Sequence, residues 1–439
     1  MNKLRFPIIV ILAPPFYSHF NPLLALARAF ASLGTRVIIG TSPDFRADAE
    51  NAGFEYREVR INKNANRGVA VETEQEDAEA RRLREFLEAT TRGPVETLIT
   101  QGRHRTDDMF ANPEQLIESI RDLNDDLHPS LWVADQLSYG ATLALMGLDL
   151  PFATFCAPHP YSIPTGDMTY SVPPEWPGIF RPSPEDEARL ISAAREVERD
   201  FTSRFNKLLS SHFSKEGVKS AFSATSSIAV ICNYPPFPNL RAPGRLFAGH
   251  SFSEQKLPET WASRIDPQRE KILIALGTFL SSRGDVLRKL IEGILSARPD
   301  AQVFVGAGPN AGEISKDFDR RVIAESFIPQ RALLPHVDAV FHHGGVSSFT
   351  ETLYMGKPMA VLPFSSDQFN VARDVERHRL GAVCDPNRVS PDAVEEALEI
   401  LVDREIRKSV EDWSGQIRGL GPESVVRELQ SSGGINGQE

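Results

Sequence analysis

The stretch from Phe327 to Gln368 reads FIPQRALLPHVDAVFHHGGVSSFTETLYMGKPMAVLPFSSDQ. Within it, the apolar segment Ala339–Phe341 is typical of a buried strand. His-His-Gly-Gly follows at 342–345, and residues 347–354 then predict a helix that ends at the next glycine and proline. Such a strand, glycine turn and helix start favour an anion, because the backbone comes close and the first N–H groups point at the ligand. The stretch therefore predicts a phosphate site.

Strand and helix patterns alternate on both sides of this stretch. Pro7–Leu12 is a continuous apolar run, as expected for a central parallel strand, and a helix follows with Asn21 as its predicted cap and Pro22 at its first position. The pattern restarts at Lys271–Leu276, after a polar segment, Gly249–Arg269, that we interpret as a linker. Two such series predict an α/β protein with two Rossmann-like doubly wound parallel-sheet domains and a cleft between them.

Composition agrees with a globular protein of more than one domain. The chain has 439 residues, a net charge of −11 and 41% hydrophobic residues. The acidic balance argues against a nucleic-acid partner or an electrostatic hold on anionic membranes. The apolar run at 8–13 is too short for stable membrane insertion, and it lacks a signal-peptide cleavage pattern. Three separated cysteines, Cys156, Cys232 and Cys384, are expected to be buried reduced thiols, as in a cytoplasmic protein.

Two residues of the first half stand where a doubly wound sheet binds its ligands. His19 follows the first strand, and Asp135 ends the apolar segment Leu131–Ala134, so both are predicted at carboxyl ends of strands. Each also has an ordinary explanation: His19 as a loop residue without a role, and Asp135 as a helix cap. The proline- and aromatic-rich segment 151–184 is predicted to be a binding loop, because long irregular segments inside compact domains are usually functional.

The polar residues around the glycine turn complete a known pattern. The chain has aromatic-x-Pro-Gln from Phe327, Leu-x-His from Leu334, His-x-Gly from His343, a Ser and a Glu in the next helix, then Gly-x-Pro, Pro and Asp-Gln. This pattern resembles the nucleotide-sugar signature of family 1 glycosyltransferases, the UDP-glycosyltransferase superfamily with the GT-B fold. The segment Ala13–His19 also resembles carotenoid glycosyltransferases, which hints at a lipophilic acceptor.

The resemblance implies roles on the donor side. Phe327 would stack on the base, His343 would bind the diphosphate, and Glu351 would bind the ribose hydroxyls. Ser348 would contact a phosphate, although Ser-x-x-Glu at a helix start is also a capping box that needs no ligand. Asp367 would bond sugar hydroxyls, which suggests a hexose. The expected donor-binding residues are Thr278, Phe327, Ile328, Gln330, His343, Gly345, Val346, Ser347, Ser348, Glu351, Asp367 and Gln368.

The resemblance also gives His19 the role of catalytic base and Asp135 that of its partner carboxylate. Family members have Gly-His-x-x-Pro where this chain has Ser18 before the histidine. The acceptor pocket is expected in the first domain, around Phe16, Tyr17, His159 and the 61–110 region, and its aromatic content suits a small apolar or aromatic acceptor.

Taken together, the residues and the resemblance predict an inverting glycosyltransferase that uses no cofactor and no metal. Its co-substrate is expected to be a UDP-sugar, with dTDP as the alternative because Val346-Ser347 matches neither the plant nor the antibiotic-tailoring pattern. The Asp-x-Asp at 317–319 is interpreted as solvated surface. A nucleotide-sugar epimerase and a non-catalytic nucleotide-sugar-binding protein are the alternatives.

The expected organisation has three parts. Residues 1–248 form the acceptor-binding domain and 249–403 the nucleotide-sugar-binding domain. Residues 404–439 form a helix that returns to the first domain, followed by a disordered tail. The expected partners are a nucleotide sugar and a small-molecule acceptor, and the sequence does not indicate an oligomeric state.

Overall fold

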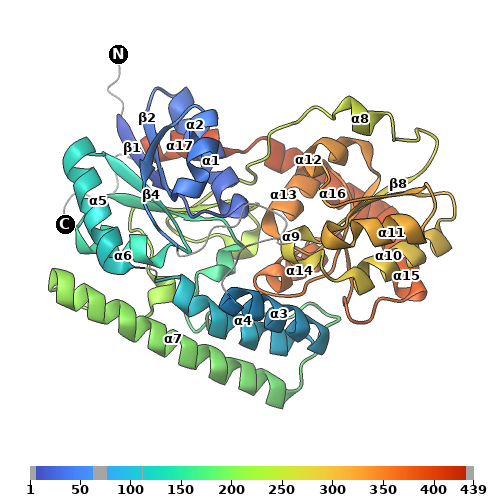
Figure 1. Cartoon of the computed structure of the whole chain (residues 1–439), viewed down its shortest axis with the longest axis horizontal. Coiled ribbons are helices and arrows are strands. Elements are labelled where there is room, and N and C mark those ends of the chain that lie inside the picture. Colours follow the sequence, from blue (N-terminus) through green and yellow to red (C-terminus); the bar gives the residue numbers. More distant parts are fainter. Residues whose placement is uncertain (1–5, 63–76, 111, 432–439) are drawn as a thin grey trace.

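The computed structural model describes residues 6–62, 77–110 and 112–431. In this part of the chain, parallel strands form two separate sheets with helices around each (Figure 1). The strand orders are β3-β2-β1-β4-β5-β6-β7 and β10-β9-β8-β11-β12-β13. Both orders reverse direction beside the first strand of the series, as in doubly wound folds. The prediction of two Rossmann-like domains is confirmed.

The first domain contains seven strands within the described residues. They are β1 (Ile8–Leu12), β2 (Arg36–Thr41), β3 (Glu55–Glu58), β4 (Leu131–Asp135), β5 (Phe152–Cys156), β6 (Val230–Cys232) and β7 (Arg245–Phe247). Its helices are α1 (Tyr17–Ser32), α2 (Arg46–Asn51), α3 (Asp77–Arg92), α4 (Pro94–Asp108), α5 (Pro113–Leu127), α6 (Tyr139–Gly147) and α7 (Pro184–Phe213).

The second sheet is formed by β8 (Lys271–Ala275), β9 (Gln302–Gly306), β10 (Val322–Glu325), β11 (Ala339–His342), β12 (Met359–Val361) and β13 (Gly381–Val383). The helices after β7 are α8 (Glu259–Ala262), α9 (Gly277–Leu280), α10 (Gly284–Ala297), α11 (Ala311–Asp317), α12 (Gln330–Leu333), α13 (Val346–Tyr354), α14 (Gln368–Arg377), α15 (Pro391–Val402), α16 (Arg404–Arg418) and α17 (Pro422–Ser431).

The side chains of β1 are apolar at every position because both faces of its sheet are buried. Ile9 and Ile11 pack into the core on one face of the sheet, while Val10 and Leu12 pack into the core on the other face. Successive side chains of a strand point to opposite faces, so a sheet covered by helices on both faces needs an unbroken apolar run. This central position brings the end of β1 beside the end of β4, its parallel neighbour.

Helix α1 begins earlier than predicted. Its N-cap is Phe16, and Pro22 lies inside the helix, so Asn21 is not the cap. The amide N–H of His19 bonds to the carbonyl of Phe16 at 2.9 Å, which opens the helix directly after β1. Pro22 removes one hydrogen bond, to the carbonyl of exposed Ser18, and at this early position the helix continues past it. His19 therefore lies in a first helical turn rather than in a loop.

Besides the separate core of each domain, one apolar cluster is shared by both. Cys156 and Ile163, at and after the end of β5, belong to the same cluster of buried residues as Val346 and Phe349 of α13. The carboxyl ends of the first sheet thus meet the helix that follows β11 in the second. Helix α16 packs on the second domain, whereas α17 packs on α1 and adds Val426 to the core of the first domain (Figure 1).

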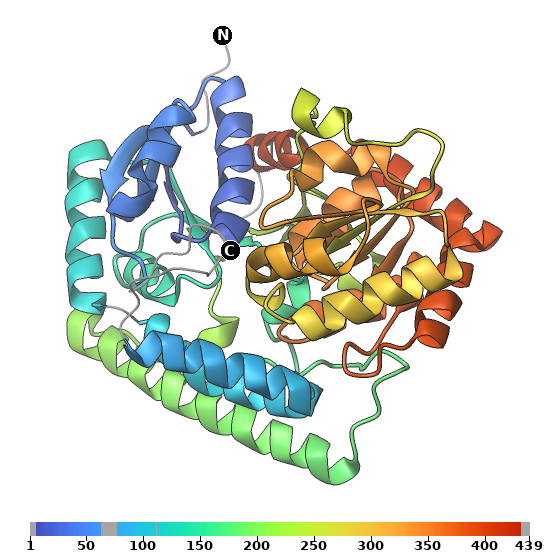
Figure 2. The ribbon, with the colours of Figure 1, turned by 45° about the vertical axis from the view of Figure 1, so that its right-hand side comes forward.

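Helices α3, α4 and α7 form a layer along one side of the molecule (Figure 2). Near the end of α3, the Thr90 hydroxyl accepts a hydrogen bond from Arg283 at 3.0 Å, and Phe86 packs against the core of the second domain. This layer therefore connects the two domains.

The cysteines are free and buried, as expected. Cys156 and Cys232 nevertheless lie opposite each other on the neighbouring strands β5 and β6. The hydrogen bond with the Cys232 thiol, together with burial, raises the pKa of Cys156 well above its usual value, so this thiol is protonated at neutral pH.

Candidate active site

His19 and Asp135 meet at the carboxyl edge of the first sheet. The Nδ1 atom of His19 lies 2.9 Å from Oδ2 of Asp135, whose side chain is fully buried. The other carboxylate oxygen accepts the amide N–H of Leu137 at 2.9 Å. The alternative role of Asp135 as a helix cap is excluded, because α6 begins after Ser138. A carboxylate so held fixes the orientation of the imidazole and stabilises its protonated form.

The aromatic residues before His19 point in different directions. The ring centroid of Phe16 lies 6.3 Å from that of His19, in an edge arrangement, so Phe16 is beside the histidine. Tyr17 packs against Phe45 with ring centroids 4.9 Å apart, and its hydroxyl donates to Asp48 at 3.0 Å. Tyr17 is thus directed into the fold near α2, away from the acceptor role expected for it.

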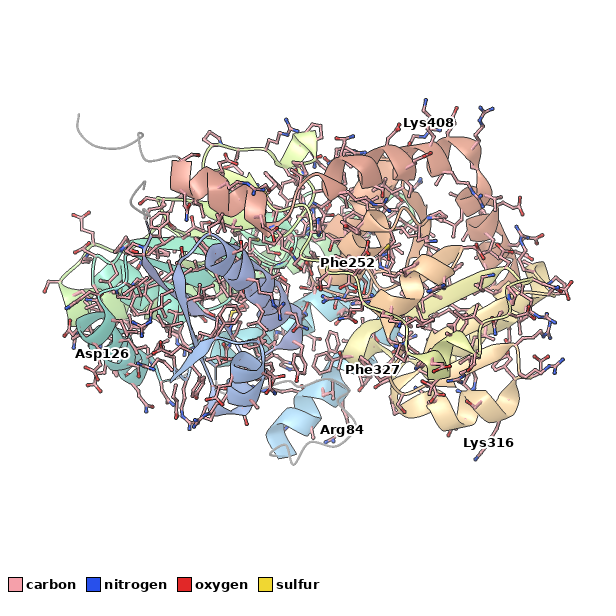
Figure 3. All side chains as sticks on the ribbon, turned by 90° about the horizontal axis from the view of Figure 1, so that it is seen from above. Arg84, Asp126, Phe252, Lys316, Phe327 and Lys408 are labelled. Atoms are coloured by element: carbon pink, nitrogen blue, oxygen red, sulfur yellow. The ribbon has the colours of Figure 1, made fainter. Side chains whose placement is uncertain are left out.

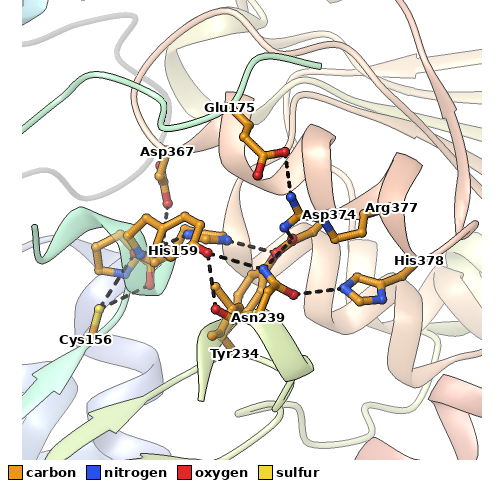
Figure 4. Close-up of polar contacts among 12 residues, drawn as sticks. Cys156, His159, Glu175, Tyr234, Asn239, Asp367, Asp374, Arg377 and His378 are labelled. Carbon is orange, nitrogen blue, oxygen red and sulfur yellow. Dashed lines mark hydrogen bonds and ion pairs between the residues drawn. The ribbon is translucent and has the colours of Figure 1, made fainter. Parts of the chain in front are cut away.

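His159 does not line an open pocket, contrary to the prediction. Its side chain is fully buried, with Nε2 2.9 Å from Asp374 and Nδ1 accepting the amide N–H of Tyr161 at 3.0 Å (Figure 4). Both ring nitrogens have protein partners, so neither is left to contact an acceptor. Sequence alone could not indicate this, because Asp374 lies 215 residues away on the second domain.

The proline-rich segment 151–184 also differs from the binding loop that was predicted. Trp176 and Phe180 both pack edge-on against Phe369 of α14, and Tyr170 stacks on Phe222 with ring centroids 3.7 Å apart. Trp176 and Phe180 therefore join the two domains, and Tyr170 packs in the core of the first domain. They are buried or half-buried, and this packing explains the aromatic content that was interpreted as an acceptor surface.

Helix α13 begins where the sequence predicts a phosphate site. Its N-cap is Gly345, which has no side chain to cap the first turn. Ser348 lies inside the first turn and accepts a hydrogen bond from Gln330 Nε2 at 3.3 Å, so the capping-box explanation is wrong. The first N–H groups of this helix, on Val346, Ser347 and Ser348, are the groups that favour an anion at a helix start.

The paired histidines before this turn have different environments. His342 is fully buried, and its Nδ1 accepts the amide N–H of Gly344 at 3.0 Å, which holds the glycine turn. His343 is half-buried, and its Nδ1 has no hydrogen-bond partner among the described residues. Burial lowers the pKa of His342 to about 3 and that of His343 to about 4. Both imidazoles are therefore neutral at neutral pH, and His343 would meet a phosphate as an N–H donor rather than as a cation.

Two glycines bracket the His343 ring. A Cβ atom on Gly277 would lie 2.8 Å from the imidazole, and one on Gly345 would lie 2.5 Å from it. Gly277 also has a φ of +78°, which favours glycine. Thr278, the predicted donor contact from β8, follows this glycine in α9 and is half-buried. The second domain therefore has room for His343 only because both neighbours lack side chains.

Glu351 has a partner that the sequence did not suggest. Its carboxylate accepts hydrogen bonds from Gln330 at 2.9 Å and from Arg331 at 2.7 Å, and the side chain is nearly buried. A buried carboxylate needs such partners. The only sequence signal for Arg331 was its place directly after the motif glutamine.

The remaining candidate donor-binding residues differ in how far their side chains are exposed to solvent. Phe327 is 75% exposed and lies near the boundary between the domains (Figure 3). Ile328 and Val346 are buried in apolar clusters, so only their main-chain atoms could reach a ligand. Asp367 accepts the amide N–H of His159 at 2.8 Å, and the side-chain oxygen of Gln368 accepts the N–H of Phe364 and that of the next residue.

The Asp-x-Asp at 317–319 is a surface feature. Asp317 pairs with Arg288 at 3.1 Å, and Asp319 pairs with Arg321 at 2.6 Å. The arginine lowers the pKa of Asp319 to about 2. No cluster of three or more His, Cys, Asp or Glu side chains suited to a metal ion occurs among the residues that the structure covers.

None of the helices in the described ranges is both long enough and apolar enough to cross a bilayer.

Comparison with known proteins gives one family match. Residues 296–418 match the family model described as "Erythromycin biosynthesis protein CIII-like, C-terminal domain". The matched region runs from the end of α10 to the end of α16 and includes the glycine turn, α13 and the Asp367-Gln368 pair.

Two curated proteins are similar over most of the chain. Demethyllactenocin mycarosyltransferase of Streptomyces fradiae is 25% identical over 422 residues, which cover 94% of this chain and 84% of that protein. Zeaxanthin glucosyltransferase of Pantoea ananas is 25% identical over 386 residues, covering 84% and 83%.

Among solved structures, the glycosyltransferase VinC in complex with dTDP has a TM-score of 0.66 at 17% identity, covering 96% of this chain and 98% of that one. This likeness shows the shared fold. The two curated relatives are transferases, which favours transfer over the epimerase and the non-catalytic alternatives.

Proposed function

We propose that the chain is a family 1 glycosyltransferase of the natural-product type, which moves a hexose from a pyrimidine nucleoside diphosphate sugar to a small apolar or aromatic acceptor with inversion at the anomeric carbon. The observation that carries this proposal is the His19–Asp135 pair, held at 2.9 Å on the carboxyl edge of the first sheet. Across the domain boundary stands the uncapped start of α13 with His343 beside it. A base on one domain and an anion site on the other are what direct glycosyl transfer needs.

In the proposed reaction, Nε2 of His19 takes the proton of the acceptor hydroxyl. The acceptor oxygen attacks the anomeric carbon from the face opposite the diphosphate, and the bond from that carbon to the diphosphate oxygen breaks. The electron pair leaves with the nucleotide. Asp135 offsets the positive charge that develops on the imidazole, because its carboxylate is buried beside Nδ1.

The second domain would stabilise the departing nucleotide without a metal ion. His343 would donate an N–H to the diphosphate, and the first amides of α13 would add their dipoles. Phe327 would stack on the base, Glu351 would accept the ribose hydroxyls, and Asp367 would accept a sugar hydroxyl. The dTDP bound to VinC supports a thymidine nucleotide as an alternative to UDP.

A calorimetric titration tests the donor site without knowledge of the acceptor. UDP and dTDP are titrated into the wild type, His343→Ala and the control Lys316→Ala, whose side chain is exposed on the same domain. We expect one nucleotide to bind the wild type at about −7 to −8 kcal/mol. His343→Ala should weaken it about tenfold, through loss of a charge-assisted hydrogen bond, and the control should bind normally. Absence of binding to the wild type would refute the proposed function.

A further inference from the structure

Helix α14 carries a buried aspartate whose partners come mostly from the other domain. Asp374 is almost fully buried. Its carboxylate contacts His159 Nε2 at 2.9 Å, the Tyr234 hydroxyl at 3.2 Å and Asn239 Nδ2 at 3.5 Å, all from the first domain (Figure 4). Arg377, one turn along α14, lies 3.8 Å away. A buried charge removed from water requires this many partners, so the junction fixes α14 against the first domain.

His159 is held at both of its ring nitrogens. Because Nδ1 accepts the main-chain N–H of Tyr161, the proton of the imidazole lies on Nε2, which donates to Asp374. Cys156 adds a contact from its thiol to the carbonyl of Pro158 at 3.4 Å. The main chain of His159 is therefore fixed in place by its own side chain and by its neighbours.

The same residue reaches a second carboxylate of the second domain. The amide N–H of His159 donates to Oδ2 of Asp367 at 2.8 Å (Figure 4). Asp367 immediately precedes α14, and Asp374 lies on its last turns. One residue of the first domain thus links the two ends of this helix, through its ring at Asp374 and through its amide at Asp367.

We propose that His159 is a positioning residue, which anchors on Asp374 and thereby orients the Asp367 carboxylate toward the sugar of the donor. This inference rests on the proposed function, in which Asp367 accepts a sugar hydroxyl. The sugar would then be recognised by a carboxylate that both domains hold, so its binding would depend on the relative placement of the domains. The nucleotide part of the donor, which lies against α13, would not depend on His159.

The experiment compares a nucleoside diphosphate with its glucose conjugate by calorimetry. UDP and UDP-glucose are the probes, or dTDP and dTDP-glucose if dTDP is the nucleotide that binds. For His159→Ala we expect affinity for the glucose conjugate to fall about tenfold, while affinity for the free nucleotide changes less than twofold. His159→Gln, whose amide can still donate to Asp374, should recover most of the loss.

The matched control is Glu376→Ala. Glu376 is also a carboxylate of α14 that accepts a main-chain N–H from the first domain, that of Gly178, at 3.0 Å. It does not contact Asp367, so its loss should leave both affinities nearly unchanged. If Glu376→Ala reproduced the selective loss, or if His159→Ala weakened both ligands equally, His159 would be a structural contact only and the proposal would be overturned.

A double-mutant cycle tests the route through Asp367. His159→Ala and Asp367→Asn should each weaken the glucose conjugate, and the double variant should lose little more than Asp367→Asn alone. His159→Pro is a second variant for the same test. The φ of −56° at this position suits proline, and the substitution removes the amide donor to Asp367 together with the imidazole. Additive losses in the cycle would contradict the proposal.

Failure of the proposed function is recognised separately, since it would leave the wild type unable to bind any of the free nucleotides. The inference would then fall with it.

Discussion

The carboxylate of Asp135 and the imidazole of His19 form a hydrogen-bonded pair 2.9 Å apart, with the aspartate fully buried and the histidine in the first turn of α1. The two residues are 116 positions apart in sequence. They meet because β1 and β4 are parallel neighbours whose carboxyl ends lie at the same edge of the sheet.

Removal of the Asp135 charge should slow the chemical step. Asp135→Asn keeps the shape of the side chain but no longer stabilises the protonated imidazole, so we expect kcat to fall on the order of 10²- to 10⁴-fold. The KM for the donor should change little. Steady-state kinetics with the wild type's best acceptor measures both. Asp48→Asn, which alters a carboxylate bonded to Tyr17 in the same domain, is the control; equal losses in the two variants would contradict the pairing role.

Substitution at Gly277 should weaken nucleotide binding through His343. A Cβ atom there would lie 2.8 Å from the imidazole, so Gly277→Ala must displace the ring. We expect about a tenfold loss of affinity for the nucleotide, consistent with loss of one charge-assisted bond. Gly53→Ala is the matched control, because Gly53 has a similar φ of +86° with no atom within 4 Å of the added carbon. Normal nucleotide binding by Gly277→Ala would show that His343 does not contact the ligand.

Arg331 should act through Glu351. Its Nε atom lies 2.7 Å from the carboxylate, which otherwise would be a nearly buried charge with fewer partners. Arg331→Leu should therefore weaken nucleotide binding several-fold and also lower the thermal midpoint of unfolding. In a double-mutant cycle with Glu351→Gln, measured by calorimetry, the two effects should not add. Full additivity would mean that the arginine does not hold the carboxylate.

Acid should destabilise the second domain through its buried histidines. His342 has a folded pKa of about 3, against an unfolded value near 6.5, because burial disfavours its charged form. The unfolded state therefore binds more protons below pH 6.5, and stability falls as the pH drops through the window from about 6.5 to 3. Between pH 6.5 and 5 the loss should be about 1.6 kcal/mol for this residue. His342→Asn should flatten the pH dependence of chemical denaturation over that window, and an unchanged slope would contradict the assignment.

The sequence predicted the parts of the structure that local patterns determine. The strand at Ala339–His342, the glycine turn and the helix from Val346 follow from apolar runs and turn residues within one short stretch. Ser390 and Pro391 at the start of α15 are an equally local signal, because the Ser390 side chain accepts the N–H of Ala393 at 3.2 Å. Each of these signals lies within a few residues of the structure that it specifies.

The errors came from contacts between distant residues. Trp176 and Phe180 lie in the segment 151–184 that was predicted to be a binding loop, but they pack on Phe369 of the other domain. His159 was assigned to the acceptor pocket for the same reason, and Asp374 binds it instead. No local pattern distinguishes an aromatic loop that binds a ligand from one that binds a neighbouring domain, because both are apolar, irregular and partly buried.

The most direct test of the proposed chemistry compares transfer and donor binding in His19→Ala. The wild type is first screened with UDP- and dTDP-glucose against a panel of small aromatic and apolar alcohols, and the variant is then measured with the best pair. We expect kcat to fall by on the order of 10²-fold or more, since a general base typically contributes that much, while the calorimetric affinity for the nucleotide stays within twofold. A variant that retains wild-type turnover would contradict the assignment of His19 as the base.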